Sequence, residues 1–295
     1  MFRPGPIFAR LLAPDLFDPD RLCRSPVELR IAVVALESGE LRYVTGRGAL
    51  VDREDHRLTE DGAIDLVDAV HASCAIPAVF PPVQLGEEHY VDGGIRENAP
   101  VEIAMSQLGV DRCYAIVAMA DGVTPDTSYA DKDMLSIVLR SAAGIMADEI
   151  HLNSVNRSRA AGAVVISPQT NLLGLLDVDP GLVAIALDYG YLTAADACES
   201  ATDTERQLTE DIVETRRQIW SLENSSLAPE LAAVEPPSDW PAELARLKRQ
   251  LRELVAQVQP SRLPSGASGW WSSWEEHLFE ISEPPTWTEV ATPSA

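Results

Sequence analysis

Segments with strand character and segments with helix character alternate along residues 28–198, and this alternation constrains the fold more than any other feature of the chain. A β-branched apolar run at 28–36 predicts a buried strand, and the alternating stretch at 41–45 predicts its half-exposed hairpin partner. Alternation of this kind predicts a chain of the α/β class. Further strands are predicted at 90–92, 113–118 (buried) and 163–167, and helices at 61–72 with Thr59 as the cap, 100–108, 131–153 and 181–197.

The charge of the chain argues against two kinds of partner. Lys and Arg total 23 against 46 Asp and Glu, which gives a formal net charge of −23. A nucleic-acid-binding protein needs a basic face, and electrostatic docking on an anionic membrane needs clustered Lys and Arg. The sequence has neither, so we expect no nucleic-acid partner and no such attraction to anionic lipid. The acidic pair Glu87-Glu88 is interpreted as a solvated turn.

The cysteines and the N-terminal residues predict a cytoplasmic protein, with peripheral membrane contact as an alternative. Residues 1–20 are interrupted by Pro and Asp and hold no apolar run of the length that a signal peptide needs. The four cysteines are scattered without a C-x-x-C pair, which is typical of reduced thiols.

The character of the chain changes near residue 201. One face of a charged helix carries Leu208, Ile212 and Ile219, and a second helix repeats apolar residues with coiled-coil spacing from Leu244 to Val258. We expect three parts, namely an α/β domain at 1–200, a helical extension at 201–260 and a Trp/Pro/Ser-rich tail at 261–295. The extension either covers the main domain or contacts a protein partner. The tail is either mobile or contacts a partner or a membrane surface.

The most informative motif has two parts. Residues 72–82 read ASCAIPAVFPP, and residues 90–100 read YVDGGIRENAP. Together they resemble the patatin-like phospholipase family, in which A-S-x-A-x-P-x-x-F-P-P leads into a strand that ends in D-G-G or D-G-A and is followed by N-x-P. The hairpin at 27–45 and the segment Asp188-Tyr189-Gly190-Tyr191 extend the resemblance to roughly residues 20–200. It implies the C-terminal part of a three-layer α/β/α domain.

Asp92 is the candidate catalytic residue. A carboxylate at a strand end lies at the edge where α/β ligand sites gather, and there it can act as a general base. The two glycines that follow, Gly93 and Gly94, permit positive φ angles and a close approach of backbone to substrate. The resemblance implies that this Asp pairs with a serine in a dyad without histidine. Such a dyad hydrolyses acyl esters of lipids or phospholipids with no cofactor and no metal.

The nucleophile of such a dyad is absent from the sequence. In the family the serine lies in G-x-S-x-G and a glycine-rich loop forms the oxyanion hole, but no serine of this chain has glycine at both −2 and +2. We expect both elements upstream of Met1, which makes the chain inactive as written. Ser73, with His71 and His89 nearby, is disfavoured as a substitute because the family uses this serine in a turn. A metal held by His89 and Asp92 is disfavoured because residues three apart on a strand face opposite sides.

Two functions from different classes are compatible with this pattern. In the first, the chain is part of a patatin-like lipid acyl hydrolase that lacks its N-terminal third, which leaves the strand at 28–36 with an unpaired apolar edge. An in-frame G-x-S-x-G in the upstream DNA would support this hypothesis, and a stop codon there would contradict it. In the second, the chain is a non-catalytic interaction protein on a degenerate patatin-like scaffold. A split enzyme, whose serine comes from a second polypeptide, is a third interpretation.

Overall fold

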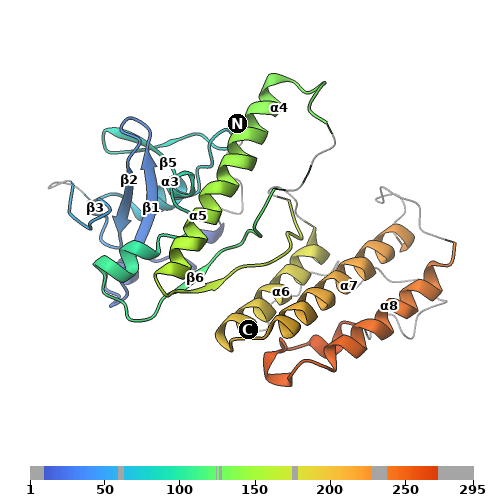
Figure 1. Ribbon diagram of the computed structural model, residues 1–295. Coiled ribbons are helices and arrows are strands. Elements are labelled where there is room, and N and C mark those ends of the chain that lie inside the picture. Colours follow the sequence, from blue (N-terminus) through green and yellow to red (C-terminus); the bar gives the residue numbers. More distant parts are fainter. Residues whose placement is uncertain are drawn as a thin grey trace. The chain divides into compact units, whose positions relative to one another are not determined.

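The computed structural model describes residues 10–58, 63–123, 125, 128–174, 179–227 and 238–271. The chain divides into two compact units, each considered by itself (Figure 1). The first unit is Met1–Ile116 with Asp121–Val165, and the second is Val117–Ala120 with Ile166–Ala295. Within the described ranges no helix is long and apolar enough to cross a membrane.

A five-stranded sheet with the strand order β3-β2-β1-β5-β4 forms the centre of the first unit. Its strands are β1 (Arg30–Ala35), β2 (Leu41–Thr45), β3 (Leu50–Val51), β4 (Val83–Leu85) and β5 (Glu88–Asp92). Every pairing is antiparallel, and the predicted hairpin at 28–45 is confirmed as β1 and β2. The expected unpaired edge is wrong, because β1 pairs with β2 on one side and with β5 on the other.

Both faces of this sheet are covered. Side chains alternate along each strand, so neighbouring residues of β1 enter different clusters. On one face Val33, Ala35 and Tyr90 pack against the helix α3 (Leu66–Ser73). On the other face Val34, Tyr43 and Val91 pack with Ile103 of η2 (Ile103–Gln107), a π-helical turn within the helix that was predicted at 100–108. Mixed α/β architecture is therefore confirmed.

The helix α3 begins later than the sequence pattern predicts. Asp65 is its N-cap, and the carboxylate Oδ1 accepts hydrogen bonds from the backbone N–H groups of Val67 at 2.7 Å and Asp68 at 3.3 Å. An aspartate at this position satisfies N–H groups that the first turn leaves without a partner, so the helix starts at Leu66. The predicted cap Thr59 and the first residues of the predicted helix lie outside the described residues.

A continuous helical rod corresponds to the helix predicted at 131–153. It consists of α4 (Met134–Leu139), the π-helical segment η3 (Arg140–Met146) and α5 (Ala147–Ala160). The α5 end contacts η1 (Gly93–Ile95), the turn that follows Asp92. In Figure 1 the rod is the long green helix, and its α4 end extends beyond the sheet of the same unit.

The predicted buried strand at 113–118 is only partly present. It is reduced to β6 (Tyr114–Ile116), which pairs with β7 (Val164–Ile166) in a separate two-stranded sheet. Tyr114 and Ile116 are exposed, whereas Ala115 and Val117 are buried. The prediction of burial was wrong because a strand covered on one face buries only every second side chain.

The second unit contains three successive helices, drawn in yellow to red in Figure 1. They are α6 (Pro180–Cys198), α7 (Asp203–Leu227) and α8 (Trp240–Val255), and α7 contacts both of the others. Their core contains the residues that the helical spacing singled out, namely Ile212, Ile219, Leu244, Leu247 and Leu251. Four tryptophans also pack against this core: Trp220, Trp240, Trp270 and Trp271. Trp274 and Trp287 lie outside the described residues.

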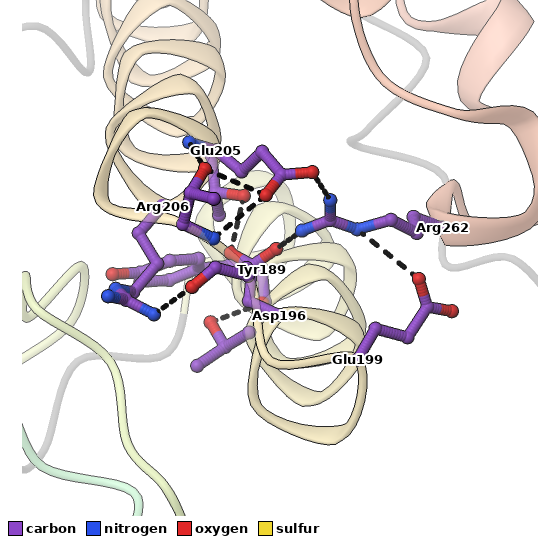
Figure 2. A network of polar contacts seen from close by, with 10 residues as sticks. Tyr189, Asp196, Glu199, Glu205, Arg206 and Arg262 are labelled. Atoms are coloured by element: carbon purple, nitrogen blue, oxygen red, sulfur yellow. Dashed lines mark hydrogen bonds and ion pairs between the residues drawn. The ribbon is translucent and has the colours of Figure 1, made fainter.

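Arg262 connects the segment after α8 to the other two helices (Figure 2). Its buried guanidinium forms ion pairs with Asp196 and Glu199 at the end of α6 and with Glu205 of α7, the last at 2.6 Å. The Asp196 carboxylate also accepts a hydrogen bond from the Thr209 hydroxyl at 2.7 Å. One side chain from η4 (Pro260–Arg262) thus neutralises three carboxylates.

We call the second unit, which contains α6, α7 and α8, the helical unit. Replacing Arg262 with alanine is expected to lower the free energy of unfolding of the helical unit by about 2 kcal/mol, because Asp196 then stays buried without its cation. Urea unfolding followed by tryptophan fluorescence measures this change. The control is Arg246→Ala, which removes an exposed ion pair with Glu243 and is expected to cost under about 0.5 kcal/mol. Equal effects of the two substitutions would contradict the role assigned to Arg262.

Candidate functional site

Asp92 is the last residue of β5 and lies opposite Val33 of β1. Its side chain shares a sheet face with Tyr90, two residues earlier, which is the face covered by α3. The backbone N–H of Asp92 donates a hydrogen bond to the carbonyl of Ala75 at 3.2 Å, so the loop after α3 is joined to the end of β5. The sheet is antiparallel, so Asp92 does not lie at the carboxyl edge of a parallel sheet as the sequence predicted. The end of α3 and the loop after it position Asp92 instead.

The carboxylate of Asp92 is held by the turn that follows it. Its Oδ1 atom accepts a hydrogen bond from the backbone N–H of Gly94 at 2.7 Å and caps the short helical turn η1. Within the described part of the chain, Oδ2 makes no such bond, so this oxygen is free to accept a proton from a nucleophile. The capping bond therefore fixes the orientation of the carboxyl group without using both of its oxygens.

The first glycine after Asp92 is required for close packing, and neither of the two glycines is required for a positive φ. Neither Gly93 nor Gly94 is among the residues with positive φ, so that expectation was wrong. A Cβ on Gly93 would lie 2.7 Å from both the Cβ and the carbonyl oxygen of Ala32, and a Cβ on Gly94 would lie 2.6 Å from Oδ1 of Asn98. The turn after Asp92 thus runs directly against β1, where a side chain has no room.

A Gly93→Ala substitution is therefore expected to destabilise the first unit by about 2 kcal/mol, since the new methyl group must displace the backbone at Ala32. Loss of far-UV circular dichroism with urea measures the effect. Gly190→Ala is the control, because a Cβ there meets nothing within 4 Å and alanine favours helix by up to about 1 kcal/mol. A Gly93→Ala protein as stable as wild type would contradict the packing argument.

Burial changes the acidity of the groups around Asp92. Desolvation raises the pKa of Asp92, and the hydrogen bond from Gly94 only partly offsets this effect. A raised pKa makes the carboxylate a stronger base than an exposed aspartate. Burial and the negative charge of Asp92 also raise the pKa of the Cys74 thiol, at the end of α3. Cys74 is therefore not activated as a thiolate nucleophile.

The structure does not assemble the other predicted candidates around Asp92. Ser73 is the last residue of α3, and among the described residues its hydroxyl forms no hydrogen bond with Asp92. The His89 ring lies 2.8 Å from Glu37, whose carboxylate also accepts the backbone N–H of His89 at 2.9 Å. Among the described residues, no group of three or more His, Cys, Asp or Glu could hold a metal ion.

Two buried side chains that the sequence pattern did not single out support the segment after Asp92. Glu97 is buried and lies 3.6 Å from Arg53, and desolvation raises the pKa of Glu97. The buried Ser154 of α5 accepts a hydrogen bond from the backbone N–H of Asn98 at 3.2 Å. Glu97 and Ser154 each lie in a polar stretch of the sequence, and such stretches are usually exposed to solvent. No signal in the sequence therefore indicated that these two side chains are buried.

A cavity of about 700 Å³ lies on the same sheet face, lined by Tyr90 but not by Asp92. Arg42 within it forms an ion pair with Glu88 and donates a hydrogen bond to the Tyr90 hydroxyl at 2.7 Å. Glu88 is thus half-buried in β5, and its interpretation as a solvated turn residue was wrong. The alternation of Arg42 with the apolar residues of β2 predicts a solvent-facing side chain, so no signal in the sequence indicated this inward-facing pair.

Comparison with known proteins identifies the part of the chain that carries Asp92. The model of one family, described as patatin-like phospholipase, matches residues 8–105. Residues 8–105 are a patatin-like phospholipase domain. This patatin-like domain includes β1 to β5, α3 and the Asp92 turn, and it ends within η2. No curated protein matches the chain. The resemblance of residues 106–200 to the family stays a prediction.

Proposed function

We propose that the patatin-like domain supplies the general base, Asp92, of a serine-type lipid acyl hydrolase. The observation that carries this proposal is the position of Asp92, which is half-buried at the end of β5 with one carboxylate oxygen held by Gly94. Its raised pKa and the family match at residues 8–105 agree with this role. Neither step of ester hydrolysis by such a dyad requires a cofactor.

In the proposed reaction a serine hydroxyl loses its proton to Asp92 while its oxygen attacks the acyl carbonyl of the lipid ester. The alcohol of the lipid leaves with the proton that Asp92 passes to it, and the acyl group remains on the serine. Water then attacks the acyl-serine and gives a proton to Asp92, which passes it to the serine oxygen as the fatty acid is released. The serine comes from outside the 295 residues, in the same polypeptide or in a second one, because the sequence holds no G-x-S-x-G.

The alternative is a non-catalytic interaction protein on the same scaffold. Two observations favour it: the sequence has no G-x-S-x-G, and Cys74 is not activated to replace the serine. In that case the helical unit is the surface that contacts a protein partner.

Ester hydrolysis by the chain with and without a serine-bearing segment separates the two functions. The segment tested is the polypeptide encoded upstream of Met1 or by a neighbouring reading frame, provided that it contains G-x-S-x-G. If Asp92 is a catalytic base, the chain alone is inactive on a phospholipid or a short-chain ester, and addition of the segment restores turnover. Failure of every such segment to restore turnover, with a soluble and monodisperse chain, would favour the interaction protein.

A further inference from the structure

The first half of the helical rod is apolar and unburied. Among the described residues, α4 and η3 contain none that is buried. Met134 and Leu135 are 73% and 66% exposed, and Ile145 and Met146 near the other end are 55% and 61% exposed. Arg140 is the one charged residue between Met134 and Met146. Large apolar residues gathered in this way on a surface mark a contact with another molecule or with lipid.

The exposed apolar residues cover more than half of the circumference of α4, which is wider than a single stripe. Five of its six side chains are large and apolar, and all five are exposed: Met134, Leu135, Ile137, Val138 and Leu139. At about 100° per residue these five side chains span an arc of about 200°, and Ser136 lies on the remaining side of the helix. A protein groove covers a narrower stripe of a helix and would leave the two edges of this arc in water. A helix that lies in the surface of a lipid layer buries its whole apolar face, which would cover all five side chains.

The lengths and charges around this segment fit the surface of a lipid layer. Asp131, Lys132 and Asp133 precede it and Asp148 and Glu149 follow it, so charged groups bound the apolar stretch at both ends. A helix of this length extends about 20 Å at 1.5 Å per residue, which is too short for a hydrocarbon core of about 30 Å. The Arg140 side chain is long enough to reach the headgroup level from the helix.

We propose that Met134–Met146 inserts into the surface of a zwitterionic lipid layer and anchors the first unit there. The proposal rests on the proposed function, since a hydrolase of lipid esters must reach an aggregated substrate. The net charge of −23 selects the kind of layer, because anionic headgroups repel the chain. The same charge repels a second copy of the chain, which would in any case cover only the facing stripe of α4.

Flotation of the full chain with phosphatidylcholine vesicles tests the insertion without any turnover. Leu135→Asp and Val138→Asp are each expected to lower the partition coefficient about tenfold, since a charged group replaces an inserted apolar one. Leu187→Asp is the matched control on α6, because Leu187 is 73% exposed, and it is expected to float like wild type. Circular dichroism of each variant is expected to match wild type, because neither Leu135 nor Val138 is buried.

The outcomes separate this proposal from the assignment of Asp92. The Asp92→Asn chain is expected to float as well as wild type, so a failed hydrolase does not affect the binding result. Replacing part of the phosphatidylcholine with phosphatidylserine is expected to weaken flotation. Absence of flotation with phosphatidylcholine, or flotation unchanged in both Leu135→Asp and Val138→Asp, would overturn the proposal. So would a wild-type dimer in sedimentation that Leu135→Asp converts to a monomer.

Discussion

An Asp92→Asn substitution in the chain supplied with its serine segment is expected to lower kcat for ester hydrolysis about 1,000-fold, because removal of a positioned general base costs 10²- to 10⁴-fold. The amide Oδ1 can still accept the hydrogen bond from Gly94, so the turn and the fold are expected to persist. The pH dependence is the second readout. Burial raises the pKa of Asp92 above its ordinary 3.8, so the wild-type rate falls with decreasing pH already above that value, as the base is protonated.

The control for this experiment is Asp68→Asn on the exposed side of α3 in the same unit, which is expected to leave kcat unchanged. Urea unfolding of both variants checks that their stability matches wild type. Full activity of Asp92→Asn would remove Asp92 from the mechanism. An Asp92→Asn enzyme with low kcat but with the acidic limb of its pH profile unchanged would show that another group titrates.

A Lys248→Met substitution is expected to destabilise the helical unit by about 3 kcal/mol near pH 8 and by much less near pH 5. Lys248 of α8 and Glu223 of α7 are both buried, and their charged atoms lie 3.0 Å apart. Burial raises the pKa of Glu223 to about 7 even beside Lys248. Without the lysine the pKa of Glu223 rises further. Near pH 5 Glu223 is therefore neutral in the folded variant, whereas near pH 8 it is either a buried charge or must take up a proton.

The sign of the pH effect follows from proton binding. The unfolded chain titrates Glu223 near its ordinary 4.5, so between this value and about 7 the folded wild type binds more protons than the unfolded chain. The contribution of Glu223 to stability is therefore fully present below about pH 4.5 and is lost as the pH rises to about 7. In Lys248→Met the same loss extends to higher pH. Urea unfolding at several pH values measures both curves.

The double variant Glu223→Leu with Lys248→Leu is the control for this pair. It removes both charges, and replacement of a buried ion pair by apolar residues is often neutral or stabilising by about 1–4 kcal/mol. Its stability is expected to equal or exceed that of wild type near pH 8. If Lys248→Met lost the same stability at both pH values, its cost would come from packing and not from the Glu223 charge.

The sequence predicted those helices and strands that show a clear spacing of apolar residues within their own length. The hairpin of β1 and β2 and the helix α6 appear where apolar spacing placed them. The start of α3 was missed because the cap is Asp65, and a sequence pattern does not decide which of several polar residues closes a turn. The burial of 113–118 was missed because it depends on how many faces of the strand are covered, and local residues do not determine that.

The same limit applies to the candidate site. The motif placed Asp92, Gly93 and Gly94 together at the end of a strand, as the structure has them. The reason for the glycines was missed, because Ala32 lies some sixty residues earlier and only the pairing of β1 with β5 brings it against Gly93. Arg42 and Glu88 were missed for a similar reason, since an ion pair between distant strands has no local signature.

The strand order indicates when the candidate site forms during folding. β1 and β2 are neighbours along the chain, and so are β4 and β5, so each hairpin can form from local contacts. The contact of β1 with β5 closes a long loop, and contacts of high sequence separation form slowly. Asp92 belongs to this last pairing, whereas all tryptophans follow residue 219 in the helical unit. Intrinsic tryptophan fluorescence in a refolding experiment will therefore report the helices while the assembly of the site passes unobserved.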